Sequence, residues 1–158
     1  MMQLRLPTPE STEALGHALA ASRPTQAVVY LQGDLGAGKS TLARALLRAL
    51  GVEGAIRSPT YTLVERYAIP AGEAWHLDLY RIGDVGELDF LGLDEATATL
   101  WLVEWPERAA YSLPPPDLQV ALADEGVGRK ATLVAGSSLG EGWLARLHET
   151  AGFAALSS

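Results

Sequence analysis

A glycine-rich segment between an apolar run and an amphipathic segment constrains the fold of this chain more than any other feature. Residues 33–40 are Gly-Asp-Leu-Gly-Ala-Gly-Lys-Ser and match the pattern G-x-x-x-x-G-K-[ST]. The run before them, residues 27–31, is continuously apolar, which is typical of a strand covered on both faces. From Lys39 to Leu50 apolar residues recur at helical spacing, and Gly51 stands where a C-cap belongs. This strand–loop–helix order predicts a phosphate-binding loop at residues 33–40, called the P-loop below.

The residue types in the P-loop are those that a bound phosphate requires. Glycines let successive backbone N–H groups converge on an anion, and the N-terminus of the following helix adds partial positive charge. We expect Lys39 to reach the β- and γ-phosphates, the Ser40 hydroxyl to hold Mg²⁺, and the Thr41 hydroxyl to suit the α-phosphate. The expected nucleotide-binding residues are Gly33, Gly36, Ala37, Gly38, Lys39, Ser40 and Thr41.

The absence of one amino acid bears on which nucleotide is bound. Guanine-specific P-loop proteins usually recognise their base with an N-K-x-D motif, and this chain contains no Asn. Adenine is usually held through backbone and apolar contacts, which need no such motif. These observations favour ATP over GTP.

Two acidic residues at the ends of predicted strands are candidates for the carboxylate that P-loop enzymes place near Mg²⁺. Asp78 lies in the predicted strand 74–80, and Glu104 follows the apolar residues 100–103. Burying an unpaired carboxylate is costly, so a metal is a reasonable partner, although a surface or salt-bridged acid fits the same pattern. Thr60, in Ser-Pro-Thr, could carry a hydroxyl to Mg²⁺ and the γ-phosphate or belong to an ordinary turn.

Helical and strand patterns alternate along the rest of the chain. A helix is predicted from a Thr8 cap and Pro9 to about residue 21, and another begins near Ser138. Further strands are predicted at residues 3–6, 61–67, 74–80, 100–105, 118–123 and 130–135, with 61–67 and 74–80 forming a hairpin. The pattern predicts an α/β, P-loop NTPase-like three-layer fold. Its mixed parallel and antiparallel sheet would be flanked by helices, in one domain over residues 1–158.

Composition argues against several classes of function. The net charge of −7 gives an acidic surface, so we expect no direct nucleic-acid binding by the chain alone. The absence of Cys excludes disulfides, thiolate metal sites and a cysteine nucleophile. No apolar run approaches the length of a membrane span, so we expect no membrane association and a cytoplasmic protein.

The acidic charge is concentrated in one segment. Residues 82–107 contain seven acids and no Lys or Arg. The segment is either a solvated surface or a docking surface for a basic protein partner. The acids are Asp84, Glu87, Asp89, Asp94, Glu95, Glu104 and Glu107.

Four motifs, in this order, resemble the TsaE (YjeE) family. They are the P-loop with Thr41, Ser-Pro-Thr-Tyr at residues 58–61, His-Leu-Asp-Leu-Tyr-Arg at 76–81 and Val-Glu-Trp-Pro at 103–106. The resemblance covers essentially the whole chain. The family consists of small bacterial P-loop ATPases of tRNA threonylcarbamoyladenosine synthesis.

The resemblance implies an ATPase, weak alone, with ATP as substrate and Mg²⁺ as cofactor. It would dock on the TsaB–TsaD pair, where TsaD modifies the adenosine beside the anticodon, and its hydrolysis would reset that complex. By motif match, Lys39 would hold phosphates, Ser40 and Glu104 would bind Mg²⁺, Thr60 would be the switch hydroxyl, and Asp78 would be needed for hydrolysis. Whether Asp78 or Thr60 also contacts Mg²⁺ stays open.

The residues that form the adenine pocket are harder to infer from the resemblance. The candidate walls are the loop near Pro9 and the loop after Ala135, with Gly136 and Ser137.

Two other functions fit the same residues. The chain could be a small-molecule kinase in which Arg57, Arg66 and Arg81 clamp a transferred phosphoryl group. It could also be a non-hydrolysing module in which ATP only orders a loop for a partner.

Overall fold

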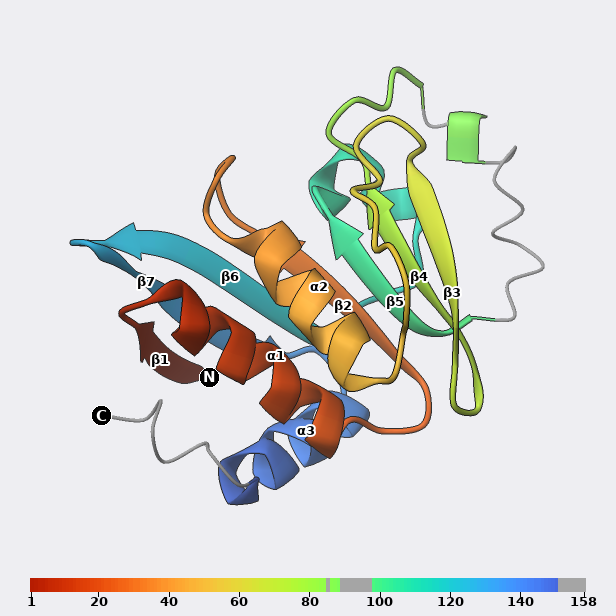
Figure 1. Ribbon diagram of the computed structural model, residues 1–158. Helices are drawn as coiled ribbons and strands as arrows, with labels where there is room; N and C mark the ends of the chain where they lie inside the picture. Colours follow the sequence, from red (N-terminus) through yellow and green to blue (C-terminus); the bar gives the residue numbers. More distant parts are fainter. Residues whose placement is uncertain (85, 89–97, 151–158) are drawn as a thin grey trace.

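Seven strands and three α-helices make up most of the computed structural model, which describes residues 1–84, 86–88 and 98–150 (Figure 1). The strands are β1 (Met2–Leu6), β2 (Ala27–Gln32), β3 (Val64–Ile69), β4 (Gly72–Asp78), β5 (Ala98–Glu104), β6 (Leu118–Glu125) and β7 (Gly128–Ala135). The helices are α1 (Pro9–Ser22), α2 (Lys39–Ala49) and α3 (Ser138–Glu149), with two short 3₁₀ turns, η3 (Pro106–Arg108) and η4 (Ala110–Ser112).

The strands form one mixed sheet in the order β1-β7-β6-β2-β5-β4-β3. In its centre β2 runs parallel to both β5 and β6, and β4 runs parallel to β5. Antiparallel pairs complete both sides, β3 with β4, β6 with β7 and β1 with β7. The predicted fold class, a mixed sheet flanked by helices, is confirmed.

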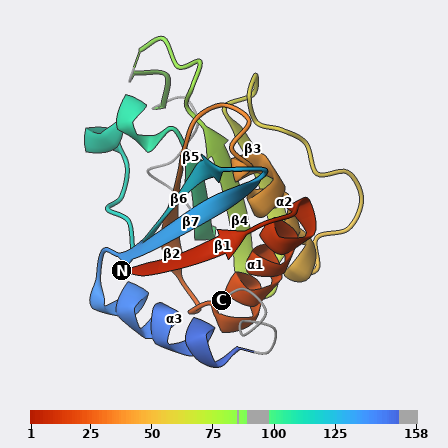
Figure 2. The same ribbon diagram turned by 90° about the vertical axis from the view of Figure 1, so that its left-hand side faces the viewer.

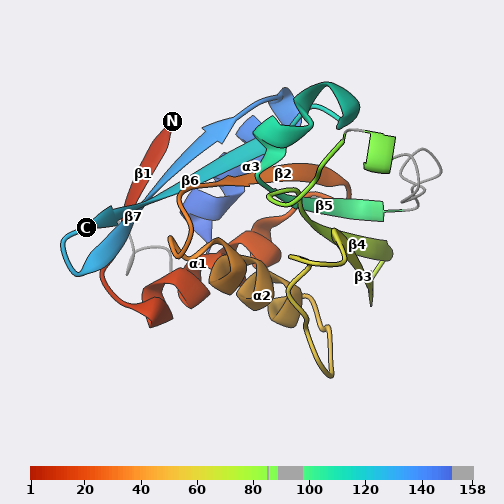
Figure 3. The same cartoon turned by 90° about the horizontal axis from the view of Figure 1, so that it is seen from above.

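The two faces of the sheet are covered differently. Helices α1 and α2 pack on one face, and the turns η3 and η4 lie on the other (Figure 3). Helix α3 contacts α1 and β7 and lies beside α1 (Figure 2). Each face therefore has its own buried cluster, one aliphatic beneath the helices and one rich in aromatic residues beneath the 3₁₀ turns.

Helix α1 begins as its sequence predicts and packs very closely on α2. The Thr8 hydroxyl accepts a hydrogen bond from the Ser11 N–H, and Pro9 occupies the first turn. Further along, a Cβ added at Gly16 would lie 2.7 Å from the Ala45 Cβ, so the two helix backbones approach closely there. This contact brings the start of α1 beside the start of α2, where the P-loop ends.

Several predicted strand boundaries differ from the structure; the strand predicted over 74–80, for example, is Gly72–Asp78, so Tyr80 lies beyond its end. The strand predicted from Tyr61 begins only at Val64, because Leu63 has a φ of +69° and breaks the extended conformation. The strand predicted to include Trp105 ends at Glu104, because Trp105 has a φ of +58°. Within the described part of the chain, no helix is both long and apolar enough to cross a membrane.

Candidate nucleotide-binding site

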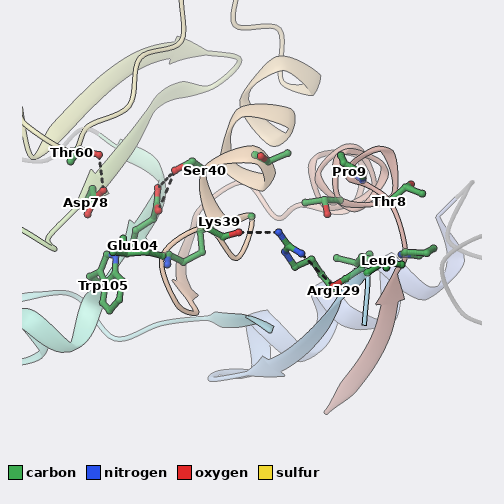
Figure 4. Close-up of a pocket in the computed structure, with 18 residues that line it drawn as sticks. Leu6, Thr8, Pro9, Lys39, Ser40, Thr60, Asp78, Glu104, Trp105 and Arg129 are labelled. Carbon is green, nitrogen blue, oxygen red and sulfur yellow. Dashed lines mark hydrogen bonds between the residues drawn. The ribbon is translucent and has the colours of Figure 1, made fainter. Parts of the chain in front are cut away.

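A cavity of about 390 Å³ opens at the ends of β2, β4 and β5, beside the P-loop (Figure 4). Its floor is formed by the P-loop and by the strand ends at Asp78 and Glu104. The start of α1 and the β6–β7 turn line its other side. Because β2, β4 and β5 are parallel, their carboxyl ends meet at one edge of the sheet, which is where ligands usually bind in open α/β folds.

The P-loop follows β2 so closely that its first residue has to be glycine. Gly33 has a φ of +143°, and a Cβ added there would overlap the carbonyl oxygen of Leu122 in β6. At the other end, Gly38 is the N-cap of α2 in a left-handed conformation, with a φ of +103°. The loop therefore wraps around the N-terminus of α2, where unpaired backbone N–H groups favour an anion.

Lys39 lies folded into the P-loop. Its ammonium group donates hydrogen bonds to the backbone carbonyls of Gly33 and, at 3.0 Å, Asp34. The Nζ atom also lies 4.4 Å from the centre of the Trp105 ring. Burial lowers the pKa of Lys39, and the nearby carboxylate of Glu104 opposes that shift.

Ser40 faces Glu104 across the floor of the cavity. The Ser40 hydroxyl lies 3.4 and 3.3 Å from the two carboxylate oxygens, and Glu104 is 3% exposed. A hydroxyl opposite one carboxylate fits Mg²⁺, which is usually held by one or two carboxylates together with phosphate oxygens and water. Among the residues described, no three His, Asp or Glu side chains gather as a metal site made by protein alone. The donors present therefore fit a nucleotide-bound Mg²⁺.

Thr60 reaches the same floor from the loop between α2 and β3. Its hydroxyl donates a hydrogen bond of 3.2 Å to the buried carboxylate of Asp78. The other Asp78 oxygen accepts from the Tyr80 N–H at 3.0 Å. Asp78 pairs in register with Glu104 on the neighbouring strand, so the two candidate carboxylates lie side by side. The structure thus brings together the residues predicted separately from three distant motifs.

Sequence analysis missed a clamp on the P-loop. The Arg129 guanidinium, which points toward the P-loop (Figure 4), donates to the carbonyl of Ala37 at 2.9 Å and to that of Gly36 at 3.0 Å. It also forms an ion pair with Asp124. Arg129 lies at the start of β7, about ninety residues after the P-loop. No local pattern marks this residue, because its role depends entirely on how the β6–β7 hairpin folds back.

The sequence analysis also gave no role in the site to Trp105, the residue after Glu104. Trp105 lines the cavity and packs at a tilted angle against Tyr80, with ring centroids 4.8 Å apart, and its ring also contacts the Lys39 ammonium group. Arg108 lies over both aromatic rings from the outer side. Trp105 therefore contacts both the P-loop lysine and Arg108. A residue that served only to fill the core would need neither contact.

One of the two expected adenine walls is misplaced. Pro9 lines the cavity, as expected. Gly136 and Ser137 do not, because they follow the carboxyl end of β7, which runs antiparallel to β6 and ends at the opposite edge of the sheet. There Ser137 caps α3 and bonds to Asp117. The wall opposite Pro9 is formed instead by residues 127–129.

One member of the acidic segment does not lie on the surface. Glu104 is buried in the cavity, which corrects its inclusion in a docking surface. The acids Asp89, Asp94 and Glu95 lie outside the described residues. The exposed members that are described are Asp84, Glu87 and Glu107.

The three arginines considered as a phosphoryl clamp do not line the cavity. Arg66 lies over Trp75 and Arg81 over Tyr61, and both contacts are outside it. Arg57 is exposed on the loop before Thr60. Their positions give no support to a kinase.

Comparisons with known proteins point to one family. The family model described as threonylcarbamoyl adenosine biosynthesis protein TsaE matches residues 6–131. A Haemophilus influenzae protein named tRNA threonylcarbamoyladenosine biosynthesis protein TsaE is 43% identical over 116 residues, covering 72% of this chain and 73% of its own length. A Bacillus subtilis protein of the same name is 36% identical, covering 80% and 81%. The crystal structure of Bacillus subtilis YdiB superimposes with a TM-score of 0.79 at 28% identity, covering 94% of each chain.

Proposed function

Because this chain belongs to the TsaE family and thus has a role in tRNA threonylcarbamoyladenosine biosynthesis, we propose that it acts there as a Mg²⁺-dependent ATPase. The observation that carries the proposal is the floor of the cavity. A P-loop lysine, a P-loop hydroxyl and a buried carboxylate converge there, with Ser40 within 3.4 Å of both Glu104 oxygens. This is the set of groups that P-loop ATPases use on a nucleotide and its metal.

In this proposal the P-loop backbone and Lys39 hold the phosphates, while Ser40 and Glu104 hold Mg²⁺. When bound, Mg²⁺ would neutralise charge that develops on the phosphate oxygens. The hydrogen bonds that Lys39 now makes to loop carbonyls would be exchanged for bonds to phosphate oxygens. Thr60 and Asp78, which already bond to each other, would orient the attacking water.

The cavity has a suitable place for adenine away from the phosphates. Its far end is lined by Pro7, Pro9 and Val127, which offer apolar surface to a flat base. A base between these residues would leave the phosphates directed toward the N-terminus of α2. Among the described residues that line this end, none is an Asp or Glu that could accept from guanine N–H groups, which agrees with the absence of an N-K-x-D motif.

We further propose that hydrolysis drives the TsaB–TsaD complex and does not itself modify RNA. The acidic net charge of −7 supports contact with proteins over contact with the tRNA backbone. The family role in tRNA modification then requires that RNA be bound elsewhere in the complex. This assignment places the chain in the cytoplasm, where tRNA is modified.

The test is ATP hydrolysis with Mg²⁺, measured alone and with the TsaB–TsaD pair. We expect weak turnover alone, stimulation by the pair, and loss of both in Lys39→Ala and Glu104→Gln. Glu141→Gln is the matched control, because Glu141 is exposed on α3 and does not line the cavity. Tight ATP binding without turnover under any condition would favour a non-hydrolysing module. Phosphate appearing on a small-molecule acceptor would favour a kinase.

A further inference from the structure

One buried polar side chain beside the floor of the cavity has no role in the proposed function. His76, on β4, is 2% exposed, and its Nε2 lies 2.6 Å from Oε2 of Glu104. Its other ring nitrogen, Nδ1, is buried and has no hydrogen-bond partner among the described residues. A polar ring in this position needs a reason, because an apolar side chain would fill the same space without leaving a nitrogen unpaired.

The contacts of the ring assign its tautomer. If Nε2 carried no proton, its lone pair would face a carboxylate oxygen at 2.6 Å, which is repulsive. A proton on Nδ1 would be a buried N–H without an acceptor, which costs more than a bare lone pair. Both contacts place the proton on Nε2, so that His76 donates to Glu104.

Among the described residues, the Glu104 side chain has hydrogen bonds with His76 and with Ser40, and the bond with His76 is the shorter. The Ser40 hydroxyl lies 3.3 and 3.4 Å away and touches both oxygens about equally, so it does little to fix the carboxylate's rotation. His76 contacts one oxygen from a strand that is hydrogen-bonded on both sides, to β3 and to β5. The ring therefore has a fixed position from which to orient the carboxylate toward Ser40.

We propose that His76 is a positioning residue for the metal site: its Nε2–H holds the Glu104 carboxylate in the orientation that binds the nucleotide's divalent cation. The proposal rests on the proposed function, since it presumes that Glu104 binds that cation. Hydrogen-bond partners of metal-binding carboxylates commonly contribute about 10- to 100-fold to metal affinity. His76 does not contact the nucleotide in this assignment and acts only through Glu104.

The metal affinity of three variants tests the proposal. Mn²⁺ replaces Mg²⁺ as the probe, and free Mn²⁺ is measured by electron paramagnetic resonance with the protein in excess over ADP. His76→Leu should weaken Mn²⁺ binding about tenfold or more, while ADP affinity measured in EDTA stays within about threefold. His76→Gln, whose amide N–H can donate from a similar position, should restore most of the loss. Ala74→Gly is the matched control, because Ala74 is buried on the same face of β4 and does not contact Glu104.

The outcomes separate this proposal from the function on which it rests. Unchanged Mn²⁺ affinity in His76→Leu, or an equal loss in Ala74→Gly, would overturn the role of His76 alone. If the unaltered chain binds ADP with no contribution from Mn²⁺, the proposed metal site itself is wrong and this inference falls with it.

A second measurement does not depend on how well the variants fold. Long-range ¹H–¹⁵N spectra of the unaltered, nucleotide-free protein report the tautomer of each His ring, and His76→Gln identifies the signal. We expect a protonated Nε2 and an unprotonated Nδ1. An unprotonated Nε2 would overturn the proposal, because that nitrogen could then not donate to Glu104.

Discussion

Replacing Gly33 by alanine should destabilise the protein far more than the same change at Gly36, although both residues belong to the P-loop. Both have a positive φ, +143° at Gly33 and +80° at Gly36, so both variants strain the backbone. The two positions differ in the space that is available to an added methyl group. An added Cβ at Gly33 would overlap the Leu122 carbonyl oxygen and lie 3.2 Å from the Ala37 Cβ, whereas at Gly36 no atom lies within 4 Å.

The difference in stability between the two variants follows from the backbone strain and the steric overlap. Strained backbone at a non-glycine residue costs about 1–3 kcal/mol, and this applies to both variants. At Gly33 the overlap also displaces a carbonyl in β6, and overpacking of this kind costs about 1–3 kcal/mol more. The loss of unfolded-state entropy on replacing Gly by Ala stabilises both variants alike and cancels. Gly33→Ala should therefore be less stable than Gly36→Ala by about 2 kcal/mol.

Urea unfolding followed by circular dichroism measures this difference. With an m-value of about 2 kcal/mol per molar urea, the midpoint of Gly33→Ala should lie about 1 M below that of Gly36→Ala. The m-values of the two variants should agree, since neither changes the surface exposed on unfolding. Equal midpoints would refute the reasoning, because they would show that β6 yields to the added methyl group at no measurable cost.

Three further predictions test other contacts of the site. Gly16→Ala should lower stability by about 1–3 kcal/mol, because its Cβ would lie 2.7 Å from that of Ala45; adding Ala45→Gly should restore part of the loss in urea unfolding. Arg129→Met should weaken ADP binding about tenfold in calorimetry by releasing two P-loop carbonyls, and Arg129→Lys should not restore it, because an ammonium group lacks the guanidinium's fork. Lys39→Met should abolish ADP binding yet leave the nucleotide-free unfolding midpoint unchanged or higher. Burial lowers the pKa of Lys39, so its charge is held at a cost in the free protein; a clearly lower midpoint would contradict this.

Local patterns were sufficient to predict the parts of the site that lie on parallel strands. The P-loop was recognised from glycine spacing between a buried strand and a helix, and the structure places it there. Asp78 and Glu104 were chosen because each stands at the end of an apolar strand. Parallel strands end at one edge of the sheet, so the structure sets the two acids side by side in register. For these residues the position along a strand already determines the place in the site.

Contacts that depend on backbone conformation outside regular elements were not predictable in this way. Trp105 was placed at the end of a strand because it follows the apolar run at residues 100–103, yet its φ of +58° ends β5, and its ring lies against Lys39. His76 shows the same limit from within a strand. Alternation places it on the same face as Asp78, but its 2.6 Å contact with Glu104 depends on the register between β4 and β5. Neither the backbone conformation of a residue nor the register between two strands can be predicted from the local pattern of hydrophobic residues.

The misplaced adenine wall shows how strand direction decides which loops reach a site. For a strand parallel to β2, such as β5 or β6, the residues after it lie beside the P-loop. β7 runs antiparallel to β6, so the residues that reach the P-loop precede it, and Gly136 at its end lies at the opposite edge. The strands 118–123 and 130–135 were both predicted, and the short stretch between them makes the second strand antiparallel to the first. Applying that direction rule to the sequence would have placed residues 127–129 at the cavity, and with them Arg129, the residue that clamps the P-loop.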